Sequence, residues 1–265
     1  MRVFLALCIA LIFSLSIYTV SADDPPPQIP TPLPREYNQD AINALMEIVE
    51  MRYGIGFAAP EEWMATGASE IMWFTDDLHG LLEALDIAAY YLWFYGEASE
   101  DQSPAEFFRQ HFDRANIVID RSMNIPGGFT GNTLPMYENE KVVSYVIQLH
   151  PVSMGSGYFV PIHELGHVVD GLLNDQPQHD FVDALGGTWA DQSWIPGKGY
   201  DGNENLFPRA TAGASEDFAD TFANMLMGRL SPEFIPVRYN FMREHLPGWL
   251  ENIRALPENT RNTRQ

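Results

Sequence analysis

Residues 163–167, His-Glu-Leu-Gly-His, decide the fold of this 265-residue chain. In a helix, His163 and His167 lie one turn apart on the same face. That spacing presents two imidazoles at the separation that a single Zn²⁺ requires. Apolar residues flank the motif on both sides: Val160, Ile162, Leu165, Val168, Val169 and Leu172. The stretch therefore predicts a buried helix over residues 157–173 that carries a zinc site.

The residue between the two histidines predicts the chemistry. Glu164 lies about 100° around the helix from His163, so its carboxylate can reach a water at the open coordination position of the metal. Zinc lowers the pKa of such a water and polarises the carbonyl of a peptide bond. Glu164 can then take the proton and pass it to the leaving amine. We therefore expect zinc-dependent hydrolysis of peptide bonds, with Glu164 as the catalytic base.

Two histidines and a water leave one protein ligand to find. A metzincin would have glycine at position 170 and histidine at position 173, where this chain has Asp170 and Leu173. Glu216 is the favoured candidate, because it lies in the first turn of a predicted helix that Ser215 can cap. Asp220 is four residues further on and shares its face, so its carboxylate can accept the second N–H of a ligating histidine.

Asp191 is the alternative third ligand. It ends the sequence Gly187-Thr188-Trp189-Ala190-Asp191, which is similar to the G-T-x-x-D element of aspzincins. However, Trp194 and Ile195 stand where that element has tyrosine and glycine. The spacing from His167 to Asp191 is also longer than in that family, so Glu216 is preferred.

HELGHVVDG at 163–171 and SEDFADTF at 215–222 carry a family resemblance. Together they resemble the catalytic domain of the anthrax lethal factor-like zinc peptidases, a gluzincin group that includes the bacterial Pro-Pro endopeptidases. The similarity extends over about residues 70–230, although only the two motifs are specific. It implies that His163, His167 and Glu216 are zinc ligands and that Glu164 is the base.

One position departs from that family. Its members commonly have a tyrosine seven residues before the third ligand, which stabilises the oxyanion, whereas this chain has Arg209. Arg209 could supply the same electrostatic help, and Tyr158 or Tyr200 could substitute for it. The remaining alternative is a catalytically weak or inactive secreted zinc-binding module that binds a protein partner.

The remaining pattern predicts an α+β, zincin-like single domain over residues 37–255, with a helical layer over a small twisted sheet. Helices are expected at 40–52, at 75–95 with Thr75 as N-cap, from Pro104 after a Ser103 cap, and last at 215–229. Strands are expected at 116–120 and 142–149, separated by a glycine turn at 127–132. The strand at 142–149 could pair with an extended substrate, as the edge strand of zincins does, or it could be a core strand. Residues 175–214 read as a long polar loop, in which 201–205 could bind Ca²⁺ or form a polar turn.

The termini and the charge indicate where the protein works. Arg2, the apolar run 3–20 and Ala22 predict a signal peptide cleaved after Ala22, or else a retained membrane anchor. A Pro-rich linker at 23–36 follows, and 256–265 form a C-terminal tail. Cys8, the only cysteine, lies in the leader. The net charge of −21 argues against nucleic acid and anionic membranes as partners. We expect a secreted protein that acts on a protein or peptide.

Overall fold

The computed structural model describes residues 38–58, 73–99, 101–121, 125, 130–150, 158–203 and 205–256. All of them belong to one compact unit that spans residues 35–265. The predicted signal peptide and Pro-rich linker lie outside the described residues, as does the predicted tail beyond Leu256. None of the helices within the described ranges combines the length and the apolar character that crossing a membrane requires.

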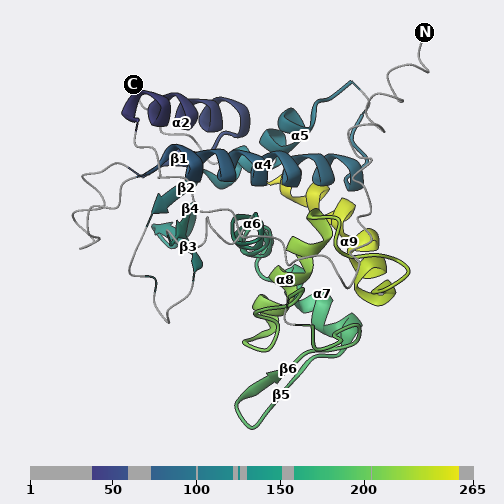
Figure 1. Ribbon diagram of the computed structural model, residues 1–265. Coiled ribbons are helices and arrows are strands. Elements are labelled where there is room, and N and C mark those ends of the chain that lie inside the picture. The colour runs from purple at the N-terminus through teal and green to yellow at the C-terminus, as the bar shows by residue number, and fades with distance from the viewer. Residues whose placement is uncertain are drawn as a thin grey trace, which may run out of the picture. The chain divides into compact units, whose positions relative to one another are not determined.

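The described elements form a mixed α+β fold, as predicted (Figure 1). In chain order they are α2 (Gln39–Tyr53), β1 (Gly56–Phe57), α4 (Thr75–Tyr95), α5 (Pro104–Phe112), a 3₁₀ turn (Asp113–Ala115), β2 (Ile117–Arg121), β3 (Gly131–Glu138), β4 (Lys141–Leu149), α6 (Phe159–Leu172), α7 (Gln176–Leu185), β5 (Thr188–Ala190), β6 (Ser193–Ile195), α8 (Ala214–Leu226) and α9 (Pro236–Ala255).

The main sheet has the strand order β1-β2-β4-β3. β1 pairs parallel with β2, β2 pairs parallel with β4, and β3 pairs antiparallel with β4. The strand at Lys141–Leu149 is therefore an inner strand, and of the two predicted possibilities the edge strand was wrong. The edge beside the predicted metal helix is β3, and no other described strand pairs with its outer side.

β3 was not predicted, because two features of this segment obscure the strand in the sequence. Pro135 interrupts its strand pattern, and Gly131 and Asn132 fall within the predicted glycine turn at 127–132, of which residues 127–129 lie outside the described ranges. The turn that joins β3 to β4 is formed by Asn139 and Glu140, which both have positive φ, and this pair is the feature of the sequence that could have indicated a hairpin. A two-residue turn of this kind matches the twist of the strands that it joins.

Helix α6 lies between the sheet and α8 and is seen nearly end-on at the centre of Figure 1. It also contacts α4, which runs across the helical layer. Gly166 brings α6 and α8 together, because a Cβ at this position would be 3.1 Å from the Cα of Ala219. The absence of a side chain at Gly166 thus sets the distance between the helix with both histidines and the helix with Glu216.

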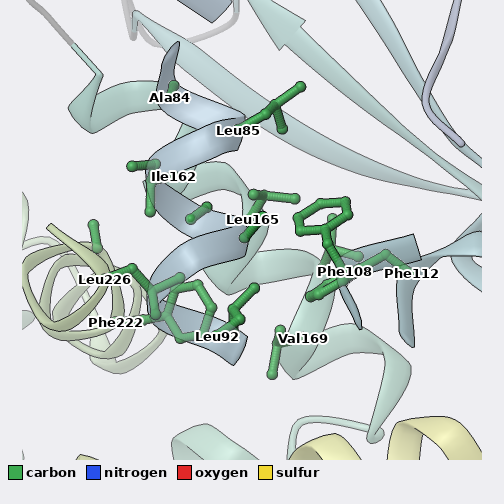
Figure 2. Close-up of a cluster of buried hydrophobic side chains, with 14 of the residues drawn as sticks. Ala84, Leu85, Leu92, Phe108, Phe112, Ile162, Leu165, Val169, Phe222 and Leu226 are labelled. Carbon is green, nitrogen blue, oxygen red and sulfur yellow. The ribbon is translucent and has the colours of Figure 1, made fainter. Parts of the chain in front are cut away.

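The apolar face of α6 forms part of the hydrophobic core (Figure 2). The side chains around it come from α4, α5 and α8: Ala84, Leu85, Leu92, Phe108, Phe112, Phe222 and Leu226. Ile162, Leu165 and Val169 are at most 1% exposed. Burial of each contributes roughly 1.5–3 kcal/mol, which keeps the opposite side of α6 in a fixed position.

Three N-cap residues were predicted; the structure confirms one of them and contradicts the other two. Ser103 caps α5 as expected, in a capping box with Glu106. The prediction of Thr75 as N-cap was wrong, because α4 begins at Thr75, and Asp77 accepts a hydrogen bond from the N–H of Phe74 instead. The prediction of Ser215 as cap was also wrong, since α8 begins one residue earlier.

Residues 175–214 are not a continuous loop. They contain α7 and a small hairpin of β5 and β6. Gly186, in the left-handed conformation, is the C-cap of α7. Trp189 and Trp194 face each other across this hairpin. The helix at 215–229 is not the last one either, because α9 follows it. Both segments mix polar and apolar residues, so neighbouring elements rather than local pattern stabilise them.

Candidate metal centre

The structure brings His163, His167 and Glu216 together at one point, as the sequence predicted. The Nε2 atoms of the two imidazoles are 3.2 Å apart. Glu216 Oε2 is 3.2 Å from His163 Nε2, and Oε1 is 3.6 Å from His167 Nε2. Two ligands come from one face of α6 and the third from the first turn of α8, so the close contact of these helices builds the group.

Both histidines are held from behind by residues of α8. His163 Nδ1 lies 2.9 Å from Asp220 Oδ1, at ion-pair distance but without good hydrogen-bond alignment. His167 Nδ1 lies 3.0 Å from the hydroxyl of Ser215. Each contact leaves Nε2 facing the shared point, which is the arrangement found behind metal-ligating histidines. Ser215 thus supports His167, a role that the sequence analysis did not assign to it.

Glu164 is buried beside this group, with 3% of its surface exposed. The hydroxyl of Thr133 donates a hydrogen bond of 2.7 Å to its Oε2. Gly131 lies against its other oxygen, since a Cβ on Gly131 would be 2.3 Å from Oε1. Edge strand β3 therefore fixes the carboxylate in place. The sequence analysis missed both positions because it did not predict β3.

The charges of the group are strongly coupled. Burial disfavours protonation of His163, but Asp220 and Glu216 outweigh it and raise the pKa of His163 to about 10. Burial and the neighbouring His163 lower the pKa of His167 to about 4. Burial raises the pKa of Glu164 to about 7, although His163 and Thr133 oppose this shift. The two imidazoles and the Glu216 carboxylate form a donor set suited to a divalent cation.

The third ligand candidate is positioned by a buried ion pair next to it. Arg238 of α9 and Asp217 of α8 are both completely buried, and the guanidinium donates to the Asp217 carboxylate. Arg238 also donates to the hydroxyl of Thr221 at 2.7 Å, and Trp194 donates to Asp217 at 3.4 Å. These bonds fix the first turn of α8, and with it Glu216.

A cavity of about 1190 Å³ opens on the group, lined by Glu164, both histidines and Glu216. Its walls come from β3, from both ends of α6 and from the loop before α8. A space of this size holds a ligand of several residues rather than a single small molecule. The cavity therefore gives a ligand access to the group.

The alternative ligand Asp191 lies elsewhere. It occupies the exposed turn between β5 and β6, with φ of 49°, and is not part of the group that could hold a metal. The Ca²⁺ alternative at 201–205 also loses its support. The side-chain oxygen of Asp201 accepts a hydrogen bond from the backbone N–H of Asn203, and that of Asn203 accepts one from the N–H of Asn205, as in an ordinary polar turn.

Of the three candidates for oxyanion stabilisation, only Arg209 lines the cavity. Its backbone N–H donates to Asp220 Oδ2 at 2.6 Å, which places Arg209 directly beside the metal group. Tyr158 instead donates its hydroxyl to Glu83. Tyr200 packs against Phe207 and the Arg238 guanidinium.

Comparisons of the chain with protein-family models, with curated protein sequences and with solved structures find no match. Function is therefore inferred from the geometry and the chemistry of the site itself.

Proposed function

We propose that this chain is a secreted zinc-dependent endopeptidase of the gluzincin type, with a zincin-like fold. The observation that carries the proposal is the triangle of donor atoms from His163, His167 and Glu216, with the buried carboxylate of Glu164 beside it.

The donor triangle fits zinc. With Zn–N and Zn–O bonds of about 2.0–2.1 Å, tetrahedral geometry separates neighbouring donors by about 3.3 Å. The three separations between His163, His167 and Glu216 are 3.2, 3.2 and 3.6 Å. Two neutral imidazoles and one carboxylate are also a common donor set for catalytic zinc. When bound, zinc would activate a water and polarise the carbonyl of the peptide bond.

The chain's own residues would divide the remaining work. Glu164 would accept the proton from the attacking water and deliver it to the leaving amine. Thr133 and Gly131 would keep its carboxylate in one orientation, through a donated hydrogen bond and close contact respectively. Asp220 and Ser215 would orient the imidazoles from behind. Burial of Glu164 keeps bulk water away from the proton that it transfers.

We place the substrate along β3. Within the part of the chain that the structure describes, no strand pairs with the outer side of β3, and Gly131, Thr133, Pro135 and Tyr137 line the cavity. An extended peptide can add to such an edge through main-chain hydrogen bonds. Arg209, in this position, would stabilise the negative charge that develops on the carbonyl oxygen.

The alternative is a zinc-binding module without turnover. It is favoured by one observation: neither Tyr158 nor Tyr200, the two tyrosines weighed for the oxyanion position, lines the cavity. Glu164 opposes this alternative, because a module that only binds zinc has no need of a buried base. Arg209 is therefore the residue whose substitution bears most directly on the choice.

The test is peptide cleavage by zinc-loaded protein, with Glu164→Gln as the matched control. We expect cleavage that a chelator abolishes, and at least a hundredfold lower rate for the variant, as is typical when a general base is lost. Glu164→Gln should retain zinc, Glu216→Ala should lose it, and Asp191→Ala should retain both zinc and activity. Absence of chelator-sensitive cleavage by zinc-loaded wild type, with no difference from Glu164→Gln, would favour the non-catalytic module.

Secretion has its own test. Expression of the full chain in a host with an export pathway should release a mature protein that begins at Asp23. N-terminal sequencing identifies the cleavage site. A full-length chain retained in the membrane fraction would favour the anchor instead.

A further inference from the structure

The cavity has two ends with different charges. Residues of the first turn of α6, Phe159 and Val160, line one end together with Arg229. We call this the Arg229 end. Asp170 and Asp175, at and beyond the last turn of α6, line the other end, together with Glu140, Arg114 and Lys141, so that carboxylates and basic groups are mixed there. Among the described residues, the only carboxylates on the lining near the Arg229 end are Glu164 and Glu216, which belong to the metal group.

The backbone of Arg229 is held firmly after the end of α8. Gly228 has φ of 65°, its N–H donates to the carbonyl of Met225, and the Arg229 N–H donates to the carbonyl of Asn224 at 2.8 Å. This pair of bonds is a Schellman motif, which ends a helix in one defined geometry. The start of the Arg229 side chain is therefore fixed relative to α8 and Glu216.

The guanidinium of Arg229 lies near the metal group. Its Cζ is 6.0 Å from the centre of the Phe159 ring, which is 5.8 Å from the centre of the His163 ring. An extended peptide advances about 3.3 Å per residue. A group bound by Arg229 would therefore be two or three residues from the peptide bond that is cleaved.

The direction of the peptide follows from β3. Gly131 lies beside Val160 and Glu164, and Tyr145, which pairs with Pro135, lies beside Gly171. β3 thus runs from the Arg229 end towards the Asp170 end. Antiparallel pairing between a substrate and β3 is more stable than parallel pairing. A substrate paired in this way would run from the Asp170 end towards the Arg229 end. Residues after the cleaved bond would then reach Arg229.

We propose that Arg229 binds a carboxylate of the substrate two or three residues after the cleaved bond, with Arg209 adding to the positive field. This inference rests on the proposed peptidase function. The carboxylate can belong to an Asp or Glu side chain or to a free C-terminus. Arginine suits either source because its planar fork of N–H groups matches a carboxylate.

The experiment compares quenched fluorescent peptides that differ only after the cleaved bond. In the first pair, the second and third residues after the cleaved bond are Asp in one peptide and Asn in the other, and both peptides have an amidated C-terminus. In the second pair, these residues are Asn in both peptides. Both end at the third position, one as a free acid and the other as an amide. We expect kcat/KM to be about fivefold higher for the carboxylate in at least one pair, as for a partly exposed ion pair. The pair that responds identifies the source of the carboxylate.

Variants of Arg229 assign the effect. Arg229→Gln should remove the preference, and Arg229→Glu should reverse it in favour of a Lys peptide. Lys198→Glu makes the same charge change at an exposed residue that does not line the cavity, and it should keep the wild-type preference. Zinc content and thermal melting verify that each variant is folded.

The two proposals fail in different ways. Chelator-sensitive cleavage with no preference in either pair, or a preference that Arg229→Glu retains, overturns the role of Arg229 and leaves the peptidase intact. Absence of chelator-sensitive cleavage by zinc-loaded wild type overturns both.

Discussion

Gly131 lies so close to Glu164 that a Cβ on the glycine would be 2.3 Å from the carboxylate oxygen Oε1. The two residues are 33 positions apart in the sequence, and they meet because β3 borders α6. A methyl group on β3 would therefore move the residue that we propose as the base, while the histidine ligands would stay in place.

Gly131→Ala should therefore lower kcat at least tenfold without loss of zinc. Crowding of this kind also costs about 1–3 kcal/mol of stability, which urea unfolding measures. Gly248→Ala is the matched control, because Gly248 lies in α9 with open space around it. That change should leave activity unaltered and stabilise the protein by about 0.5–1 kcal/mol. Full activity in Gly131→Ala would contradict the proposed position of the base.

Thr133 is expected to contribute through its hydroxyl alone. Thr133→Val keeps the shape of the side chain and removes the hydrogen bond to Glu164, so we expect kcat to fall about tenfold, in line with a net loss of about 1–1.5 kcal/mol. Thr133→Ser keeps the donor and should retain most of the rate. Steady-state kinetics of the three proteins decide the matter, and equal loss in both variants would indicate a role in packing only.

Asp220 is expected to control zinc affinity. Asp220→Ala removes the carboxylate behind His163, and such changes typically weaken metal binding about 10- to 100-fold. Ser215→Ala should have a smaller effect, because a neutral hydroxyl polarises His167 less than a carboxylate does. Competition with a chromogenic chelator measures both constants. Wild-type affinity in Asp220→Ala would show that His163 is oriented by other contacts.

The ion pair of Arg238 and Asp217 should matter for stability rather than chemistry. Arg238→Met leaves the Asp217 carboxylate buried without its charged partner, which should cost about 3–5 kcal/mol. The double variant Arg238→Met with Asp217→Leu removes both charges and should recover most of that loss. Urea unfolding of wild type, the two single variants and the double variant gives the coupling energy between the two residues. If the effects of the two single substitutions simply add, the ion pair does not stabilise the protein as proposed.

Asp170 should make stability depend on pH. Burial raises the pKa of its carboxyl from 3.8 to about 7, although the N–H of Gln178 donates to it at 2.9 Å. The folded state thus holds this proton more tightly than the unfolded state does. The bound proton therefore contributes its full stabilisation below about pH 4, and this contribution is lost as the pH rises towards 7 and beyond. The loss has an upper bound of about 4 kcal/mol.

Asp170→Asn has no such proton and keeps an oxygen that can accept the Gln178 N–H. Its stability relative to wild type should rise between pH 4 and pH 8, measured by urea unfolding at fixed zinc concentration. A difference that stays constant over this range would mean that Asp170 has an ordinary pKa.

The parts of the fold that could be predicted are those with a strong local signal. The helices at α2, α4, α5 and α6 follow from apolar spacing and from caps, and β4 follows from its β-branched residues. α7, α9 and β3 were missed. Each has a weak local pattern, with Pro135 in the strand and Pro247 inside the last helix, and is stabilised by neighbours distant in sequence.

For the site, the sequence by itself determined the donors on α6, because two histidines four residues apart share a face in any helix. It also indicated Glu216, with Asp220 one turn further on. Only the tertiary structure decided that α6 and α8 approach closely enough for three donors to meet, that β4 is an inner strand, and that Gly131 and Thr133 hold Glu164. The reason is that local spacing depends on one backbone geometry, whereas contacts between elements depend on which faces are buried together.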